Sequence, residues 1–228
     1  MAASVSLRAA LRDWRRRDPT LRSPPPAAVL AAARAERELV HQLALARRPS
    51  GRRAIAALPS GLRPAIAADV AAARALRKLD GPPTGGTLRL VPPPPAGSLL
   101  ADYRAAQRRF GVPWQVLAAI NFVESAFGRV AIRSSAGARG PMQFMPATWH
   151  EYGLGGNVHS PRDAIMGAAN YLHHSGAPAD TARALYAYNP SHLYVTAVLD
   201  YARQMRDDPL GFLTYYSWEA SLPAVLHG

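Results

Sequence analysis

The chain of 228 residues contains no cysteine. It therefore cannot form disulfide bonds, use a thiolate as a nucleophile or bind a metal through sulfur. No run of about 18 apolar residues occurs, so we expect no transmembrane segment. The first twenty residues lack the apolar stretch and the small-residue cleavage site of a secretion signal, and no signal peptide is evident.

Acidic residues are scarce in the first part of the chain. The net charge is +12, and residues 1–98 hold 17 Lys and Arg against 6 Asp and Glu, whereas residues 99–228 hold 10 against 9. A basic field of this kind favours anionic polymers, such as wall polymers, lipid head groups or nucleic acid. The alternative is a solvated helix surface that is rich in arginine.

Proline-rich segments divide the chain at residues 24–26, 82–83 and 92–95. Between the first two, apolar residues recur every three or four positions over 28–46 and over 62–76. These patterns predict two amphipathic helices that lean on the rest of the protein, since each buries little area alone. We therefore interpret residues 1–98 as a basic helical extension with a proline-rich linker from 84, and residues 99–228 as the main domain.

From Leu99 onward the sequence is helical, and no period-2 pattern indicates a strand. The clearest helix start is Ser160-Pro161-Arg162-Asp163, where Ser160 can cap the helix and the Asp163 carboxylate can answer the cap. The expected helices are 99–110, 113–127, 141–144, 146–152, 160–175, 180–188 and 191–205, followed by a short aromatic tail at 212–218. The predicted fold class is all-α.

Within the predicted helix 113–127, Leu117, Ile120 and Glu124 share one face. A carboxyl group there lies among apolar neighbours near the negative end of a helix, and both surroundings disfavour its charged form. Glu124 should therefore hold its proton near neutral pH, as a general acid requires. The alternative is a solvent-facing Glu with a salt-bridge partner, which is the commoner environment.

Four motifs follow one another in a fixed order. They are Glu124-Ser125, then Gly137-Ala138-Arg139-Gly140-Pro141-Met142-Gln143-Phe144-Met145-Pro146-Ala147-Thr148, then Ala187-Tyr188-Asn189, and then Tyr194-Val195. Over about residues 99–205 the sequence resembles the soluble lytic transglycosylase (SLT) domain. Residues 140–152 and 160–172 look most like the actinobacterial and membrane-bound lytic transglycosylase B branch.

This resemblance implies a lysozyme-like (goose-type) α fold with a long groove. It also implies a peptidoglycan lytic transglycosylase, which cleaves the β-1,4 bond between N-acetylmuramic acid and N-acetylglucosamine and leaves 1,6-anhydro ends. Glu124 would be the catalytic acid and base, and the glycan strands of peptidoglycan would be the partner.

The resemblance further implies a set of substrate contacts. The matching residues are Ser134, Gln143, Met145, Tyr188, Asn189 and Tyr194. Gln143 offers an amide to sugar hydroxyl or acetamido groups, while Met142 is better explained as a core residue. Tyr188 can bond the catalytic carboxyl or a substrate acetamide, whereas Tyr194 is the less certain contact and could simply pack.

Two segments depart from the family pattern. Pro190-Ser191 replace the usual Ala-Gly after Ala-Tyr-Asn, and residues 153–159 lack the carboxylates that calcium requires. His173 and His174 are neighbours on a helix and point apart, so they cannot chelate a metal together. We expect no metal and no cofactor.

Other functions stay open at this point. A true lysozyme would need a second carboxylate, for which Asp163 and Glu151 are candidates that a cap and a surface position explain equally well. A wall-binding module without activity is a further alternative, and no nucleic-acid motif supports DNA binding. We expect an extracytoplasmic, wall-associated or secreted protein that acts on peptidoglycan, with the basic region bound to anionic wall polymers.

Overall fold

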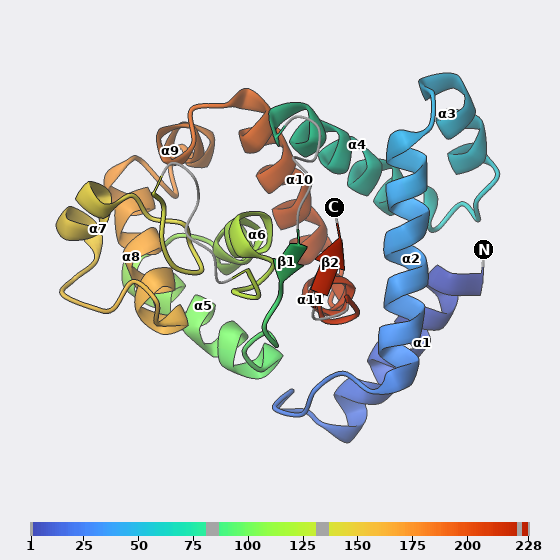
Figure 1. Cartoon of the computed structure of the whole chain (residues 1–228), viewed down its shortest axis with the longest axis horizontal. Helices are drawn as coiled ribbons and strands as arrows, with labels where there is room; N and C mark the ends of the chain where they lie inside the picture. Colours follow the sequence, from blue (N-terminus) through green and yellow to red (C-terminus); the bar gives the residue numbers. More distant parts are fainter. Residues whose placement is uncertain (1, 81–86, 131–136, 223–224, 228) are drawn as a thin grey trace.

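The computed structural model describes residues 2–80, 87–130, 137–222 and 225–227. Within these ranges the chain forms eleven helices and two short strands (Figure 1). In chain order they are α1 (Ala2–Arg17), α2 (Ala27–Leu45), α3 (Arg48–Ala56), α4 (Arg63–Asp80), β1 (Thr87–Arg89), α5 (Ala96–Phe110), α6 (Trp114–Ser125), α7 (Pro146–Tyr152), α8 (Pro161–His174), α9 (Thr181–Tyr188), α10 (His192–Asp207), α11 (Gly211–Ala220) and β2 (Val225–His227).

The all-α fold class is confirmed. The two strands have three residues each and pair antiparallel, with Thr87 opposite His227. An isolated bridge between Leu90 and Val130 continues from β1 toward the end of α6. The two strands therefore join segments that are distant in the sequence, but they do not form a sheet around which the fold is built.

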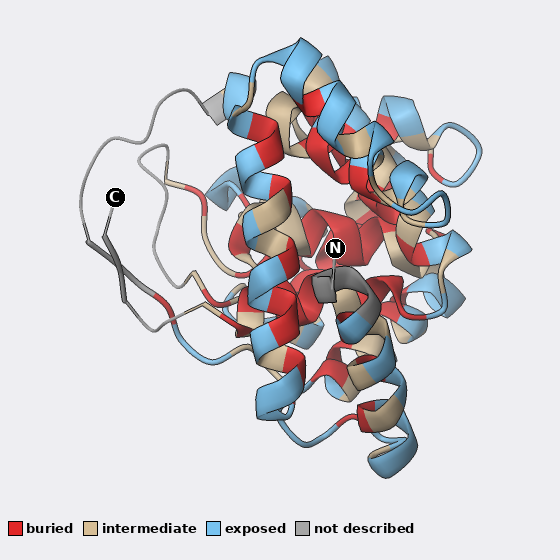
Figure 2. Cartoon of the chain, turned by 90° about the vertical axis from the view of Figure 1, so that its right-hand side faces the viewer, coloured by how far each residue is buried: buried red, intermediate tan, exposed pale blue. Residues whose placement is uncertain are grey.

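The N-terminal helices pack on the C-terminal part of the chain. Helix α1 runs along α2, α2 contacts α4 and α11, and α4 lies against α10 (Figure 1). Val29 and Val40 of α2 and Ile66 and Val70 of α4 are buried in the hydrophobic cluster that also contains the later helices. The two predicted amphipathic helices thus lean on the rest of the protein as expected, and the outward faces in Figure 2 are mostly exposed.

Several arginines of the basic region close helix ends. The guanidinium of Arg74 donates to the carbonyl oxygens of Leu43, Ala44 and Ala46 at the end of α2, at 2.8–3.1 Å. Arg34 donates to the carbonyl of Ser221 after α11. Terminal carbonyls have no partner within their own helix, so a cationic donor stabilises them. Part of the positive charge of residues 1–98 is therefore structural.

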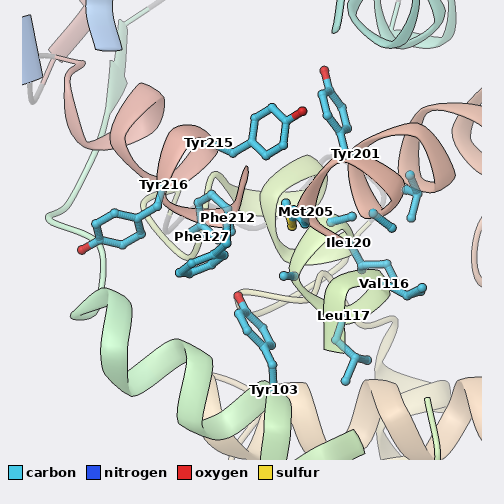
Figure 3. Packing of buried hydrophobic residues seen from close by; sticks show 14 of the residues in the cluster. Tyr103, Val116, Leu117, Ile120, Phe127, Tyr201, Met205, Phe212, Tyr215 and Tyr216 are labelled. Carbon is cyan, nitrogen blue, oxygen red and sulfur yellow. The ribbon is translucent and has the colours of Figure 1, made fainter. Parts of the chain in front are cut away.

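Helices α5, α8, α10 and α11 pack around α6. Figure 3 shows Val116, Leu117 and Ile120 of α6 among side chains from the neighbouring helices, including Tyr103 of α5 and Met205 of α10. All five side chains are buried. Helix α6 is consequently apolar on most of its circumference, and its C-terminal end is placed by contacts with several helices.

Several helix ends lie where the sequence predicts them. Helix α5 stops at Phe110, with Gly111 in the left-handed conformation at φ 76°. Helix α8 starts after Ser160, whose hydroxyl accepts from the Asp163 amide at 3.3 Å. The expected reciprocal cap is wrong, because the Asp163 carboxylate instead accepts from the backbone amide of Asn157.

Other expectations about helices were wrong. The expected helix 141–144 is absent: residues 140–143 form a turn, because Arg139 and Phe144 pair as an antiparallel bridge on either side of them. The helix 113–127 ends earlier, at Ser125, and the expected tail at 212–218 is the buried helix α11. Helices α1 and α3 were not predicted, and residues 96–98 of the expected linker belong to α5.

No helix among the described residues is long and apolar enough to cross a membrane. The proposed boundary between an extension and a catalytic domain at residue 98 stays a prediction. The close packing of α2 and α4 on α10 and α11 means that removal of residues 1–98 would expose apolar surface.

One buried carboxyl group joins α4 to α10 and α11. Oδ1 of Asp69 accepts from the Tyr215 hydroxyl at 2.7 Å and from the Gln204 amide at 2.6 Å. Burial raises the pKa of Asp69 from its ordinary value of 3.8 to about 7, and nearby Glu36 adds to the rise against the opposing effects of the two donors and Arg8. Ionised Asp69 is therefore a destabilising element of this junction.

We predict that Asp69→Asn stabilises the protein at pH 8 by about 2–4 kcal/mol, because Asn keeps the oxygen acceptor and removes the charge. Because the pKa of Asp69 is higher in the folded state, the wild type has its greatest stability below about pH 4, where Asp69 is protonated in both states. It loses free energy of unfolding as the pH rises through 7. The unfolding free energies of variant and wild type, measured in urea, should therefore converge near pH 4. An equal difference at both pH values would contradict this role of Asp69.

Candidate active site

Glu124 stands one residue before the end of α6 and is half-buried. The preceding turns are anchored by buried Val116, Leu117 and Ile120. The side chain thus leaves a helix that cannot rotate without unpacking its apolar faces. The position of the Glu124 carboxyl group is therefore fixed by the packing of α6.

The chain turns sharply after α6. Ala126, Phe127 and Gly128 all have positive φ, at 52°, 61° and 82°. This conformation disfavours residues with a side chain, so the surroundings must stabilise it. Phe127 is fully buried and its ring meets Phe212 edge-on at 5.6 Å, while the amide of Gly128 donates to the Ser125 hydroxyl at 2.9 Å.

Ser125 and Asn121 join α6 to the loop that carries the second motif. The Ser125 hydroxyl donates to the carbonyl of Pro141 at 2.6 Å, and the Asn121 amide donates to the same oxygen at 2.8 Å. The Tyr103 hydroxyl of α5 donates in turn to Oδ1 of Asn121 at 2.6 Å. All three side chains are buried. The serine of the Glu-Ser pair therefore positions the loop beside the acid.

The loop itself is a tight turn between Arg139 and Phe144, whose amides and carbonyls bond one another at 2.8 and 2.9 Å. Gly140 has φ 73°, and a Cβ atom at this position would lie 1.9 Å from the carbonyl oxygen of Val158. Glycine is thus required by a backbone contact within the protein. Gln143 also has a positive φ, 49°, and its amide donates back to the Gly140 carbonyl at 2.9 Å.

Tyr194 forms a hydrogen bond with Glu124, the predicted acid. Its hydroxyl, in the first turns of α10, donates to Oε1 of Glu124 at 2.7 Å. Tyr188, at the end of α9, instead donates to the carbonyl of Met142 at 2.5 Å. The two tyrosines therefore divide the tasks of holding the carboxyl group and holding the loop.

Both phenols are neutral donors. Burial raises the pKa of Tyr188 and of Tyr194 well above 10, and the negative charge of Glu124 raises them further. A phenol with a raised pKa keeps its proton over the whole range in which a carboxyl group titrates. Tyr194 can accordingly donate to an ionised Glu124 without losing its proton.

The remaining predicted contacts are distributed around this centre. Met145 is an exposed methionine, with 46% of its surface accessible, whereas Met142 is fully buried, as expected for a core residue. Asn189 follows α9, and its side chain makes no hydrogen bond to another described residue. Ser134 lies outside the described residues.

Aromatic rings connect the elements that flank the turn. The Phe144 ring meets Trp149 of α7 at 5.1 Å and Tyr188 of α9 at 6.0 Å, both edge-on. Tyr188 in turn meets Tyr171 of α8 at 5.7 Å. Edge-to-face pairs of this kind add to the packing that holds α7, α8 and α9 around the loop.

Asp163 and Glu151, the two candidates for a second catalytic carboxylate, both have other partners. The Asp163 carboxylate accepts from the Asn157 amide at 3.0 Å, and Glu151 is exposed on α7 and bonds Tyr152. His173 bonds the Phe110 carbonyl and His174 the Asn170 carbonyl. In the described ranges no three His, Asp or Glu residues are grouped as a metal site would need.

Asn121 and Tyr103 are site residues that the sequence analysis missed. The available signal was a single amide side chain inside the apolar run from Ala118 to Val123. A fully buried polar side chain must find partners, and here it finds Tyr103, Ser125 and the loop carbonyl.

Residues 103–209 match the family described as the Transglycosylase SLT domain. No curated protein and no solved structure matches the chain. The matched range begins inside α5, ends just after α10 and includes Glu124, the loop, Tyr188 and Tyr194. The match supports the SLT family for this region, whose fold is all-α and lysozyme-like, and it indicates lytic transglycosylase activity on peptidoglycan in general.

We predict that Tyr194→Phe lowers kcat on peptidoglycan by roughly 10–100-fold with little change in KM, because a hydrogen bond to a charged group is worth about 1.5–3 kcal/mol. The control is Tyr201→Phe, which removes a hydroxyl from another buried tyrosine of α10. It should retain wild-type kcat. Equal kcat values for both variants and the wild type would show that the bond to Glu124 is not used.

Proposed function

We propose that the SLT domain at residues 103–209 cleaves the β-1,4 bond between N-acetylmuramic acid and N-acetylglucosamine and leaves 1,6-anhydro ends. The observation that carries the proposal is the bond of 2.7 Å between the Tyr194 hydroxyl and Glu124, in the domain that matches the family. Glu124 acts as the single acid and base.

The reaction needs one carboxyl group in two protonation states. Protonated Glu124 gives its proton to the glycosidic oxygen as the bond to C1 breaks, and the acetamido group of the substrate stabilises the cationic centre. The ionised Glu124 then takes the proton of the C6 hydroxyl, whose oxygen bonds to C1. One C–O bond breaks, one forms within the same sugar, no water is consumed and Glu124 regains its proton.

Tyr194 supports the ionised stage of this cycle. A neutral phenol that donates to the carboxylate compensates for the loss of water around it. It also holds the carboxyl group in one orientation between the two proton transfers. Because the pKa of Tyr194 is raised well above 10, the phenol does not compete for the role of acid.

The positions of the other carboxylates favour a single-carboxylate mechanism over that of a true lysozyme. An inverting or retaining hydrolase sets two carboxyl groups at a fixed separation across the bond. Asp163 is engaged by the loop before α8, and Glu151 lies on the exposed side of α7. Both have structural explanations that do not involve Glu124.

We assign the substrate contacts to the family motifs. Gln143 and Met145 lie on the loop that Ser125 holds, and Tyr188 and Asn189 lie at the end of α9. We propose that these residues and Ser134 contact the sugars, with Tyr194 serving mainly the carboxyl group. The closer kinship with the lytic transglycosylase B branch and action outside the cytoplasm, at the wall, belong to the same proposal.

The basic N-terminal region would bring the enzyme to its polymer. Arg12, Arg15, Arg16 and Arg17 are exposed on α1, whereas Arg74 is engaged by helix carbonyls. We propose that the exposed arginines attract anionic wall polymers, an attraction that is screened over about 8–10 Å at physiological salt.

We predict that Glu124→Gln folds normally and that its activity is lower than that of the wild type by about 10²–10⁴-fold. The Gln amide has the shape of the carboxyl group but cannot give a proton to the substrate. Clearing of a turbid peptidoglycan suspension measures the loss, and circular dichroism checks the fold. Glu151→Gln, a change of the exposed carboxylate on α7, is the matched control and should clear at the wild-type rate. Wild-type clearing by Glu124→Gln would refute the assignment.

The products provide a second prediction. If one carboxyl group performs both proton transfers, the released fragments end in non-reducing 1,6-anhydro sugars. Mass analysis should therefore find fragments that lack one water relative to hydrolysis products, and borohydride should label few of them. A majority of reducing ends would assign the enzyme to the lysozyme class.

A further inference from the structure

A cavity lies between α1 with the turn that follows it and the SLT domain. Its volume is about 340 Å³, and its walls include Arg15 of α1, Arg104 of α5 and Arg206 of α10. Trp114 and Leu213 are among its apolar lining residues, and neither Glu124 nor the 137–145 loop takes part. The cavity is therefore separate from the site of cleavage.

The charge around this cavity has one sign. All three arginines are exposed, and no carboxylate lines the space. Among the described residues, Arg15 and Arg104 form no ion pair, while Arg206 bonds its neighbour Asp207 at 2.8 Å. The positive charge is therefore supplied mainly by Arg15 and Arg104.

The nearest acidic residues of α1 and the following turn are engaged elsewhere. Asp13 pairs with Arg16 and Arg17 at 3.1 and 2.8 Å. Asp18 accepts from Thr20 and from the Ser23 amide, which hold its pKa below its ordinary value. Neither carboxylate therefore bonds Arg15 or Arg104 directly.

We propose that this cavity binds a phosphate group of an anionic wall polymer. A guanidinium group donates two parallel hydrogen bonds to phosphate or carboxylate. A planar carboxylate offers two oxygens in one plane, whereas a tetrahedral phosphate can meet donors that arrive from three helices. The two arginines of this cavity without an ion-pair partner, Arg15 and Arg104, come from different helices, α1 and α5, and Arg206 of α10 adds charge beside them, an arrangement that favours phosphate.

The surroundings favour a polymer over a membrane surface. Binding to a bilayer uses exposed apolar side chains beside the cationic ones. The exposed large apolar residues of the described chain are Leu45, Val91, Met145, Leu154 and Tyr186. None of them lines the cavity. A phosphate that projects from a flexible chain can enter the recess, and the apolar lining can contact the adjoining organic part.

This inference rests on the proposed function only for the location of the enzyme at the wall. It adds that the basic region and the SLT domain build one site together, since Arg15 lies outside residues 103–209 and the other two arginines inside. Wall attachment would then hold the catalytic domain itself and not only a tethered extension.

The test compares two double variants of the full-length chain. Arg15→Gln with Arg104→Gln removes two charges from the cavity. Arg108→Gln with Arg183→Gln removes two charges from exposed positions of α5 and α9 that do not line it. Binding of poly(glycerol phosphate) is measured by titration calorimetry at physiological salt, after circular dichroism has shown both variants to be folded.

We expect the cavity variant to bind poly(glycerol phosphate) about tenfold more weakly than the wild type, since each exposed contact is worth roughly 2–5-fold. The control should stay within about twofold. Equal losses in both variants, or none in either, would overturn the site. Binding to phosphatidylglycerol vesicles in place of the polymer, or equal affinity for inorganic phosphate, would overturn the polymer as its occupant.

Catalysis is followed separately in the same variants. Turnover of a small soluble peptidoglycan fragment should match the wild type in both, because neither pair touches Glu124. Conversely, Glu124→Gln should bind poly(glycerol phosphate) with wild-type affinity. Failure of the phosphate site and failure of the proposed reaction therefore give different results.

Discussion

The carbonyl group of Pro141 is the point on which the geometry of the site depends. It accepts from Ser125 and from Asn121, two buried side chains one helical turn apart on α6. The loss of either donor in such surroundings costs about 1–3 kcal/mol. Two donors on one oxygen fix both the distance and the direction of the loop relative to the helix, so that Glu124 and the loop form one rigid unit. The next carbonyl, of Met142, accepts from Tyr188 and thereby adds α9 to this unit.

Local signals in the sequence were sufficient where a helix end depends on its own residues. Gly111 and Ser160 are examples, since a left-handed glycine and a serine cap act within one turn. The end of α6 lacked such a signal, because Ala126 and Phe127 have side chains yet adopt positive φ, in a turn where the Phe127 ring is buried and the Gly128 amide donates to the Ser125 hydroxyl. Helix α11 was read as a tail because it is buried on nearly all sides and has no amphipathic period. The tyrosine that bonds Glu124 was likewise beyond local reasoning. The motif suggested Tyr188, whereas the bond is made by Tyr194, which lies 70 residues from the acid.

The charge asymmetry of the sequence has two physical origins in the fold. Arginines such as Arg34 and Arg74 donate to carbonyl groups at the ends of helices. Others, such as Arg15 and Arg16, face solvent. A sum of charges cannot separate these classes, since both contribute equally to it. Both classes keep their charge, because a carbonyl group does not neutralise a guanidinium, but only the second class has donors left for a polymer.

Helix α10 links the two halves of the molecule. Its first turns carry Tyr194, which bonds Glu124, and its last turns carry Gln204, which bonds Asp69 of α4. Between them the Tyr201 ring meets Phe122 of α6 edge-on at 4.9 Å. A helix held at three points along its length cannot shift at one of them without strain at the others. The N-terminal helices, although they lie outside the matched domain, therefore help to set the position of the hydroxyl group that meets the acid.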